Sequence, residues 1–327
     1  MMREHAKPAI ALTIGDCNGV GPEIVLKSVH HPSVKRICAP VLVGPVEVFE
    51  YYADRLGMAL PSHPIVESSV LPRSQIKPGL LSARSGRAAA QAIEAAVELA
   101  RAGVVQALVT APVSKHALHR AGVRFPGHTE MLQRLTGARH VAMMLVSGDM
   151  RVGLVTIHIP LKNVASVLTR KLVREKVEVV YRSLMRDWGI RNPRMAVLAL
   201  NPHAGEAGDI GTEEHRIIAP VIKSLAAANL HVAGPFPADA FFARYKPGTY
   251  DAVVAMYHDQ GLIPLKMSAH GRAVNFSAGL PIVRTSPDHG TAFDIAGKGT
   301  ADPGSMMEAI KLAVTVAKNR QRNAAHR

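Results

Sequence analysis

The amino-acid sequence predicts an α/β protein with a mainly parallel sheet, and three observations support this fold class. The chain has 327 residues, and hydrophobic residues make up 48% of them, enough to bury a large core. Aromatic residues make up only 4%, which suits parallel strands covered by helices better than an aromatic-rich sandwich. Short apolar runs alternate with helical patterns throughout the chain, the order that β-α-β units produce.

The expected strands are short apolar runs bounded by polar or turn-forming residues. Such runs are typical of strands that helices cover on both faces. In chain order they are Ala9–Ile14, Ala39–Val43, Ala107–Thr110, Ala142–Val146, Val152–Ile157, Met195–Leu200 and Ala252–Met256.

The expected helices lie between these runs. The segment Arg84–Arg101 is rich in alanine, and Lys171–Trp188 is amphipathic. Thr212 begins a third helix, because Glu213 and Glu214 follow it and acidic side chains are favourable in a first turn. No repeat or Gly/Ser-rich linker divides the chain, so two lobes would share one continuous structure.

The chain is strongly basic. Lys and Arg total 39 against 25 Asp and Glu, a formal net charge of +14, which suits nucleic acid, an anionic membrane or anionic small molecules as partners. The basic residues are scattered, however, and no basic run is interleaved with aromatic residues. A solvated surface is therefore favoured over a nucleic-acid interface.

Cysteine content and hydropathy indicate a cytoplasmic protein. Cys17 and Cys38 are too few for a disulfide framework. No window reaches the ~18 apolar residues of a membrane span. The apolar stretch Pro8–Ile14 is followed at once by Gly15 and Asp16, unlike a signal peptide. We therefore expect no membrane partner and no nucleic-acid partner.

Three histidines, His158, His203 and His258, stand just beyond the ends of expected strands. The carboxyl ends of parallel strands share one sheet edge, where ligands bind, so residues far apart in sequence can converge there. Three neutral imidazoles suffice for zinc or another divalent ion and leave a coordination position for substrate. The chain has 16 histidines, so ordinary polar loop residues are the competing interpretation. His231 has no such setting and is interpreted as a surface residue.

Two further stretches have the composition of an anion-binding site. Residues 127–130 read G-H-T-E, whose groups suit either an anion or a turn with a helix cap. The stretch from Lys266 through Asn275 to Arg284 supplies an ammonium, an amide and a guanidinium, which suit phosphate or carboxylate. Scattered surface cations are the alternative interpretation of this stretch.

The segment Ser286–Ser305 is rich in small residues, which let a backbone approach a ligand closely. A Gly-rich surface loop is the alternative. From His289 the segment reads H-G-T-A-F-D-I-A-G-K-G, which resembles the adenosine-binding loop of isopropylmalate and isocitrate dehydrogenases. That fold lacks the usual dinucleotide fingerprint, and this chain lacks it too. The resemblance implies that NAD, or alternatively NADP, contacts His289, Gly290, Thr291, Ala292 and Asp294.

Seven motifs together resemble a single family. They are TIGDCNGVGPEI, TAPVSK, PGHTE, NPHAGE, GTEE, MYHDQG and GLPIVRTSPDHGTAFDIAGKG, and they extend from Thr13 to the last helix. In this order they resemble the 4-hydroxythreonine-4-phosphate dehydrogenase family of pyridoxal phosphate (vitamin B6) biosynthesis. The resemblance implies a two-lobed α/β/α fold like that of isocitrate and isopropylmalate dehydrogenases, with a cleft between the lobes. Residues 1–130 and 275–327 would form a discontinuous cofactor-side lobe, and residues 131–274 a second lobe with metal ligands and dimer contacts.

The same resemblance assigns roles to individual residues. It implies that His158, His203 and His258 bind one divalent cation, Zn, Mg or Co, at the interface of a homodimer. Asp239, in the run PADAFF, matches an acidic position near the substrate and is a candidate for proton transfer. The implied substrate-binding residues are His128, Thr129, Lys266, Asn275 and Arg284.

One residue departs from the pattern of the family. Cys17 stands where the first motif usually has proline, so the loop is expected to be less rigid. Close to the site, Cys17 would be a reactive thiol. A buried, packed cysteine is the alternative.

The implied reaction is NAD-dependent oxidation of 4-hydroxythreonine 4-phosphate at its C3 alcohol, followed by decarboxylation to 3-amino-2-oxopropyl phosphate. In this scheme the metal stabilises developing charge, and Arg284 and Lys266 hold anionic groups. The nearest alternative is a dehydrogenase for 4-phosphothreonate or 4-phosphoerythronate in sugar-acid breakdown, and cis-dihydrodiol dehydrogenases are a further branch. A basic nucleic-acid-binding protein and a metal-dependent hydrolase are the alternatives from other classes.

Overall fold

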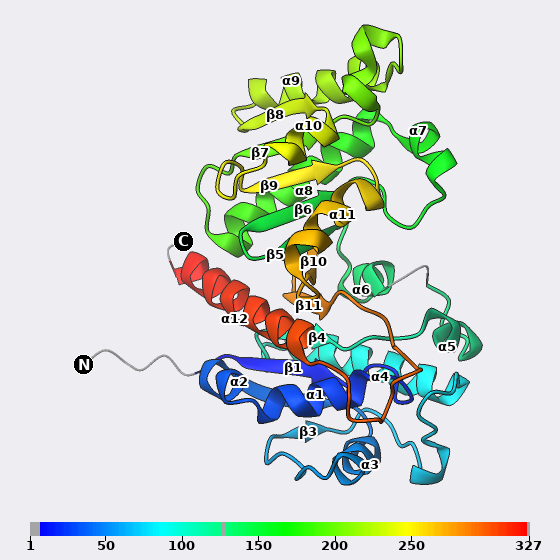
Figure 1. Ribbon diagram of the computed structural model, residues 1–327. Coiled ribbons are helices and arrows are strands. Elements are labelled where there is room, and N and C mark those ends of the chain that lie inside the picture. The colour runs from blue at the N-terminus through cyan, green and yellow to red at the C-terminus, as the bar shows by residue number, and fades with distance from the viewer. Residues whose placement is uncertain (1–6, 126–127, 326–327) are drawn as a thin grey trace. The chain divides into compact units, whose positions relative to one another are not determined.

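The computed structural model describes residues 7–125 and 128–325, and the chain divides into two units (Figure 1). The first unit comprises Met1–Ala138 and Leu280–Lys318, and the second comprises Arg139–Gly279 and Asn319–Arg327. The division expected from sequence places its boundaries after residues 130 and 274 and assigns the whole C-terminal segment to the first lobe.

The sheet of the first unit is parallel throughout. Its strands lie in the order β3-β2-β1-β4-β11, and all paired neighbours run in the same direction. The carboxyl ends of β1, β4 and β11 therefore share one edge, where the loops that follow these strands begin. The bounds are β1 Ala9–Thr13, β2 Ala39–Val43, β3 Ile65–Val66, β4 Ala107–Thr110 and β11 Arg284–Pro287.

The Ala-rich helix α4 (Ala83–Arg101) packs across β1, β2 and β4. It begins where the Ser82 hydroxyl accepts the N–H of Arg84 at 3.2 Å. Gly86 lets it approach the next helix closely, since a Cβ there would lie 2.2 Å from Ala117 O. The other helices that begin in this unit are α1 Gly21–His30, α2 Pro32–Ile37, α3 Val46–Leu56, α5 Lys115–Arg120, α6 His128–Thr136 and α12 Gly304–Ala325.

The second unit contains a mixed sheet in the order β10-β5-β6-β9-β7-β8. The pairs β10–β5 and β5–β6 are antiparallel, whereas β6, β9, β7 and β8 are parallel neighbours. The strand bounds are β5 Ala142–Ser147, β6 Met150–Leu154, β7 Met195–Leu198, β8 Val232–Phe236, β9 Ala252–Ala255 and β10 Val274–Ala278. The helix bounds are α7 Val164–Val167, α8 Arg170–Trp188, α9 Ala219–Ala227, α10 Ala238–Ala243 and α11 His258–Ala269.

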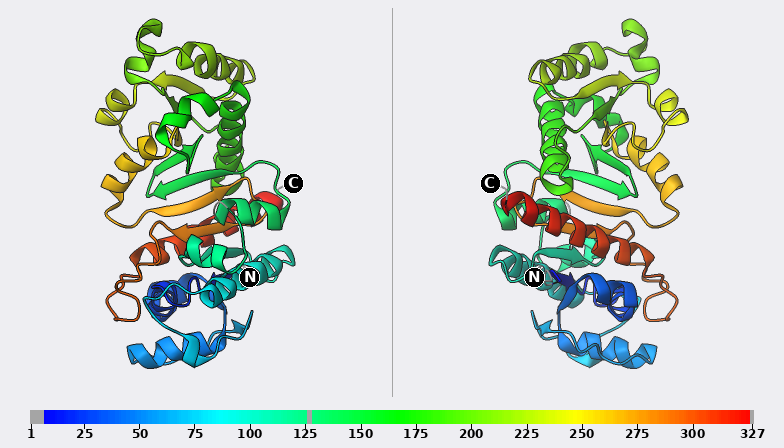
Figure 2. Two further views of the ribbon diagram at one scale, coloured as in Figure 1. Left: turned by 90° about the vertical axis from the view of Figure 1, so that its right-hand side faces the viewer. Right: turned by 90° about the vertical axis from the view of Figure 1, so that its left-hand side faces the viewer.

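Helices α8 and α11 cover opposite faces of this sheet (Figure 2). The adjacent residues Val152 and Gly153 of β6 point to opposite faces, as successive strand residues do. A Cβ at Gly153 would lie 2.6 Å from Val180 of α8, whereas a Cβ at Gly261 of α11 would lie 2.5 Å from Val152. Both glycines thus allow a helix to pack closely on the strands.

The predicted fold class is confirmed, and so are the strands in all seven predicted runs. The run Val152–Ile157 is wrong in its last residues, because β6 ends at Leu154 and the chain bends toward His158. The helix predicted from Thr212 is confirmed, because helical backbone begins at Glu213, and Glu214–Ile218 form a π-helix that continues into α9. Among the described residues, no helix is both long and apolar enough to cross a lipid bilayer.

Candidate functional site

The three histidines singled out from sequence follow neighbouring parallel strands of the second unit. β6, β9 and β7 lie side by side, and His158, His258 and His203 come after them in that order. The ring centroids of His158 and His258 are 5.8 Å apart. His203 is exposed and lies on the segment Pro202–Gly208. Within the described part of a single chain, no three His, Cys, Asp or Glu side chains group as a metal site.

Buried polar side chains link the strand ends that carry the histidines. Gln260 of α11 donates from Nε2 to Ala199 O at 2.6 Å and accepts from Met256 N at 2.7 Å. Thr156 donates from Oγ1 to Met256 O, also at 2.7 Å. Because Ala199 follows β7, Met256 follows β9 and Thr156 follows β6, these bonds fix the three strand ends relative to one another.

The segment around His203 has an unusual backbone. Residues 203–207 all have positive φ, although only one of them is glycine, and a left-handed residue with a side chain costs about 1–2 kcal/mol. The buried carboxylate of Glu214 holds the start of this segment by accepting the N–H groups of Leu200 at 2.7 Å and Asn201 at 2.8 Å. Backbone strain that is held in this way is typical of functional sites.

The ring of His258 is oriented by its neighbour. Its Nδ1 lies 2.7 Å from Asp259 Oδ1, and its side chain is 34% exposed. A carboxylate on Nδ1 favours the tautomer in which Nε2 carries a lone pair. His258 is therefore prepared to act as a ligand through Nε2.

Arg284, the first residue of β11, is buried with 1% of its surface exposed, and its side chain reaches the carboxyl end of β4. Its Nε and Nη2 donate to Thr110 Oγ1 at 3.1 and 2.7 Å. β11 begins with Arg284 and β4, its parallel neighbour, ends with Thr110. Burial lowers the pKa of the guanidinium to about 10, so the group stays charged at neutral pH, and a bound anion would offset the cost of burying it.

The G-H-T-E motif lies partly outside the described residues. Gly127 and the side chain of His128 are not described, although α6 begins at His128. Thr129 is buried in the first turn of α6. The Oε2 atom of Glu130 is buried and makes no hydrogen bond within the described part of the chain.

The other predicted substrate residues lie in the second unit. Lys266 is exposed on α11, and Asp239 is exposed in the first turn of α10. Asn275 lies on β10, and its Oδ1 is buried without a hydrogen-bond donor among the described residues. A buried acceptor that lacks a donor is costly, so Asn275 suits a ligand that donates a hydrogen bond.

The predicted cofactor residues lie in the segment between β11 and α12, which contains no helix or strand. The N–H of Val20 donates to Thr291 O at 2.9 Å. A Cβ at Gly19 would lie 2.9 Å from the same carbonyl oxygen, so this approach requires glycine. Thr291 and Ala292 are half-buried, whereas His289, Gly290 and Asp294 are exposed.

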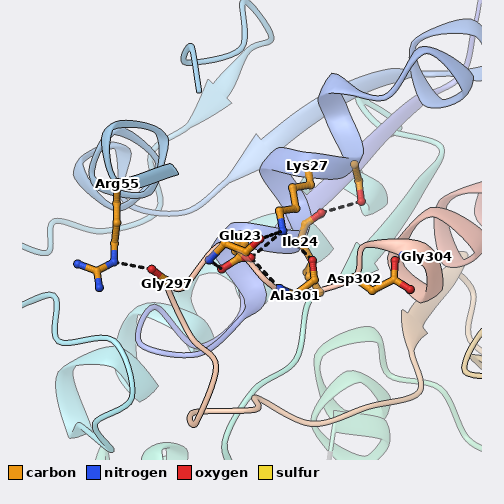
Figure 3. Close-up of polar contacts among 10 residues, drawn as sticks. Glu23, Ile24, Lys27, Arg55, Gly297, Ala301, Asp302 and Gly304 are labelled. Atoms are coloured by element: carbon orange, nitrogen blue, oxygen red, sulfur yellow. Dashed lines mark hydrogen bonds and ion pairs between the residues drawn. The ribbon is translucent and has the colours of Figure 1, made fainter. Parts of the chain in front are cut away.

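Two side chains of α1 hold the later part of this segment (Figure 3). The carboxylate of Glu23, which is fully buried, accepts the N–H groups of Ala301 at 2.9 Å and Gly299 at 3.3 Å. The ammonium of Lys27 donates to the carbonyl oxygens of Gly299 and Ala301, both at 2.8 Å. Hydrogen bonds from side chains of α1 to main-chain groups of the segment therefore hold it, in addition to apolar packing.

Cys17, in the loop after β1, is fully buried. Burial raises the pKa of its thiol, so it is not a reactive thiolate at neutral pH. Its carbonyl oxygen accepts the Tyr52 hydroxyl at 3.0 Å, which ties the loop to α3. Of the two alternatives for Cys17, the structure shows the buried, packed cysteine.

Three buried residues that hydrogen-bond the predicted site segments were not singled out from sequence. Thr110 stands within TAPVSK, Gln260 within MYHDQG and Glu23 within GVGPEI. All three are polar residues with 9% or less of their surface exposed. Their motifs were the available signal, but burial, which distinguishes a positioning residue from a surface one, is not visible in a sequence.

The chain is similar over almost its whole length to known proteins. Residues 36–313 match a family model described as the pyridoxal phosphate biosynthetic protein PdxA. The chain is 40% identical over 340 residues to a 4-hydroxythreonine-4-phosphate dehydrogenase of Bacteroides thetaiotaomicron, covering 99% of this chain and 93% of that protein. It is 43% identical over 329 residues to a D-threonate 4-phosphate dehydrogenase of Cupriavidus necator, covering 96% and 98%.

Solved structures show the same similarity. A 4-hydroxythreonine-4-phosphate dehydrogenase from Klebsiella pneumoniae gives a TM-score of 0.85 at 38% identity, covering 96% of this chain and 99% of that one. A terephthalate 1,2-cis-dihydrodiol dehydrogenase from Burkholderia xenovorans gives 0.66 at 32% identity, covering 94% and 98%.

Proposed function

The chain belongs to the family of the pyridoxal phosphate biosynthetic protein PdxA, and from this premise we propose that it oxidises 4-hydroxythreonine 4-phosphate at its C3 alcohol. The reaction removes a hydride from C3 and a proton from its hydroxyl. Loss of carbon dioxide from the resulting keto acid then gives 3-amino-2-oxopropyl phosphate. The observation that carries this proposal is the 40% identity over 99% of the chain to a relative named for this activity.

Substrate binding is proposed to depend on Arg284. A guanidinium offers a planar set of donors that matches phosphate, and Thr110 already fixes its orientation. The other proposed substrate-binding residues are His128, Thr129, Lys266 and Asn275. Asp239 is the proposed acceptor of the hydroxyl proton, since it is exposed and acidic.

The segment between β11 and α12 is proposed to bind NAD, with NADP as the second candidate. A bound nicotinamide supplies the hydride acceptor. Small residues and held main-chain groups suit a dinucleotide that approaches the backbone closely. The residues proposed to contact it are His289, Gly290, Thr291, Ala292 and Asp294.

His158, His203 and His258 are proposed to hold one divalent cation, with zinc, magnesium and cobalt as candidates. Imidazole nitrogens suit zinc best of these three ions, and two of the rings already lie 5.8 Å apart. Gln260 fixes the strand ends from which His203 and His258 extend. A bound cation supplies a Lewis acid at the reacting carbon–oxygen group.

We further propose that a second copy of the chain completes this site. The segments that carry the histidines also carry exposed apolar side chains, with Leu161 70% and Met267 74% exposed, and Ile210 and Ile263 about half exposed. Such side chains are typical of a surface that another protein covers. A homodimer would bury them on both copies at once. Analytical ultracentrifugation tests this, and a monomer that turns over substrate would contradict it.

Replacing Thr110 by valine is expected to raise the KM for the phosphorylated substrate about tenfold, because Arg284 loses the acceptor that orients it. Thr110→Ser keeps the hydroxyl and should retain most of the affinity. Thr285→Val is the matched control, since the buried Thr285 hydroxyl bonds Ala309 O rather than Arg284. Steady-state kinetics on the three variants measures the effect, and equal KM values for Thr110→Val and Thr285→Val would contradict it.

The second candidate function is oxidation of D-threonate 4-phosphate, which the 43% identity to a relative of that name favours. A screen of NADH formation decides between the two. The screen compares 4-hydroxythreonine 4-phosphate, D-threonate 4-phosphate and an unphosphorylated cis-dihydrodiol, each with and without divalent metal. Highest kcat/KM on the first substrate supports the proposal, and no NADH with any of them would overturn it.

A further inference from the structure

Glu23 and Lys27 together provide hydrogen-bond partners for main-chain groups in the segment between β11 and α12. Glu23 accepts two of its N–H groups, and Lys27 donates to the carbonyl groups of the same two residues. The two side chains, one helical turn apart on α1, also bond each other at 2.8 Å. All three N–H groups of the Lys27 ammonium therefore have an acceptor. Glu23 is fully buried and the Lys27 side chain is 23% exposed, so the charged pair lies at the edge of the protein interior.

Two more contacts extend this anchoring along the segment. Arg55 of α3 donates from Nε to Gly297 O at 2.6 Å (Figure 3). The N–H of Val20 donates to Thr291 O at 2.9 Å. The segment is thus fixed near both of its ends, and at every one of these contacts it contributes main-chain atoms.

The residues that Glu23, Lys27 and Arg55 anchor, which are Gly297, Gly299 and Ala301, differ from the residues proposed to contact the cofactor. His289, Gly290 and Asp294 are exposed, whereas Glu23 is fully buried beneath the segment. A substitution at Glu23 or Lys27 therefore removes no group that would touch a dinucleotide.

We infer that the Glu23–Lys27 pair is a positioning device that presets the shape of this segment for a dinucleotide. It controls the affinity for the cofactor rather than the chemical step, because a preformed loop loses less conformational entropy on binding. The inference rests on the proposed role of the segment in binding NAD.

Glu23→Gln tests the inference, because a neutral amide of the same size cannot accept both N–H groups and also pair with Lys27. The Kd for NADH, measured by fluorescence titration, is expected to rise about tenfold. The KM for NAD should rise in parallel, while kcat stays within about twofold of the parent value. Trypsin cleavage after Lys298, which is exposed in the segment, should accelerate about tenfold because the segment opens more often.

Lys311→Met is the matched control. It removes an ion pair between two side chains of α12, Lys311 and Glu308, which does not bond the segment between β11 and α12. The NADH affinity and the rate of cleavage after Lys298 should therefore both stay at the parent values. Lys27→Met provides a second test if Glu23→Gln does not fold, as judged by circular dichroism. If neither variant folds, the pair is a determinant of folding and the inference is overturned.

The two readouts separate the possible failures. Faster cleavage with unchanged NADH affinity would show that the pair has only a structural role, and it would overturn the inference. Unchanged cleavage together with unchanged NADH affinity would also overturn it. If the parent protein does not bind NADH, the proposed cofactor role of the segment is wrong. The inference is then overturned as well, even if the cleavage rates show that the pair orders the segment.

Discussion

Replacing His203 by asparagine is expected to lower kcat/KM about a thousandfold or more while the protein stays folded. The proposed cation would lose one of three imidazole ligands. His203 is exposed on its segment, so its removal opens no cavity in the core. Asparagine is the informative substitution because His203 has a φ of 53°, and asparagine tolerates the left-handed region better than alanine does. His203→Ala should lose turnover equally and be somewhat less stable.

Three measurements check this expectation. Metal content by mass spectrometry should fall with activity, the melting temperature of His203→Asn should stay close to that of the parent, and a strong chelator should reproduce the loss of activity in the parent protein. His231→Ala is the control, since His231 is exposed and lies at the other end of the same unit's strands, just before β8. Full activity of His203→Asn, or of metal-free parent protein, would remove the metal from the mechanism.

The strands that carry the site could be predicted because they are short apolar runs. Ala107–Thr110 and Ala252–Ala255 form strands where the sequence predicts them, since parallel strands covered by helices need continuous apolar residues. The parallel order of β6, β9 and β7 then places the residues that follow them on one edge. This is why three distant histidines could be selected from their position after apolar runs alone.

Strands β10 and β11 could not be predicted, because each contains a polar residue that is proposed to bind substrate. β11 reads R-T-S-P and β10 reads V-N-F-S-A, and neither is an apolar run. Arg284 and Asn275 are polar residues within these strands, and both are proposed substrate residues. Their polar side chains make them candidates for substrate binding, and for the same reason these strands lack the continuous apolar pattern by which strands are predicted.

The internal supports of the site could not be predicted either. Gln260 and Glu23 are polar residues near the start of helices, where exposed polar residues are common. In the structure, Gln260 bonds main-chain groups of residues that follow two different strands, and Glu23 bonds a segment more than 270 residues away in the chain. Contacts of such long sequence separation depend on the assembled fold, so only the folded chain shows them.

Replacing Arg284 by lysine is expected to raise the KM for 4-hydroxythreonine 4-phosphate about a hundredfold, although the charge is formally kept. Arg284 uses Nε and Nη2 to bond Thr110, and its planar guanidinium matches the geometry of a phosphate group. A lysine ammonium is a single point of charge and cannot bond Thr110 and form a planar fork at once. Its burial would also favour the neutral form of the lysine.

The effect on phosphate binding can be separated from an effect on folding. Inorganic phosphate should raise the melting temperature of the parent protein and not that of Arg284→Lys, because only the parent binds the anion in its folded state. Arg272→Lys, at an exposed position, is the control and should behave as the parent in both assays. A parent protein that turns over an unphosphorylated diol as well as the phosphorylated substrate would show that Arg284 does not select for phosphate.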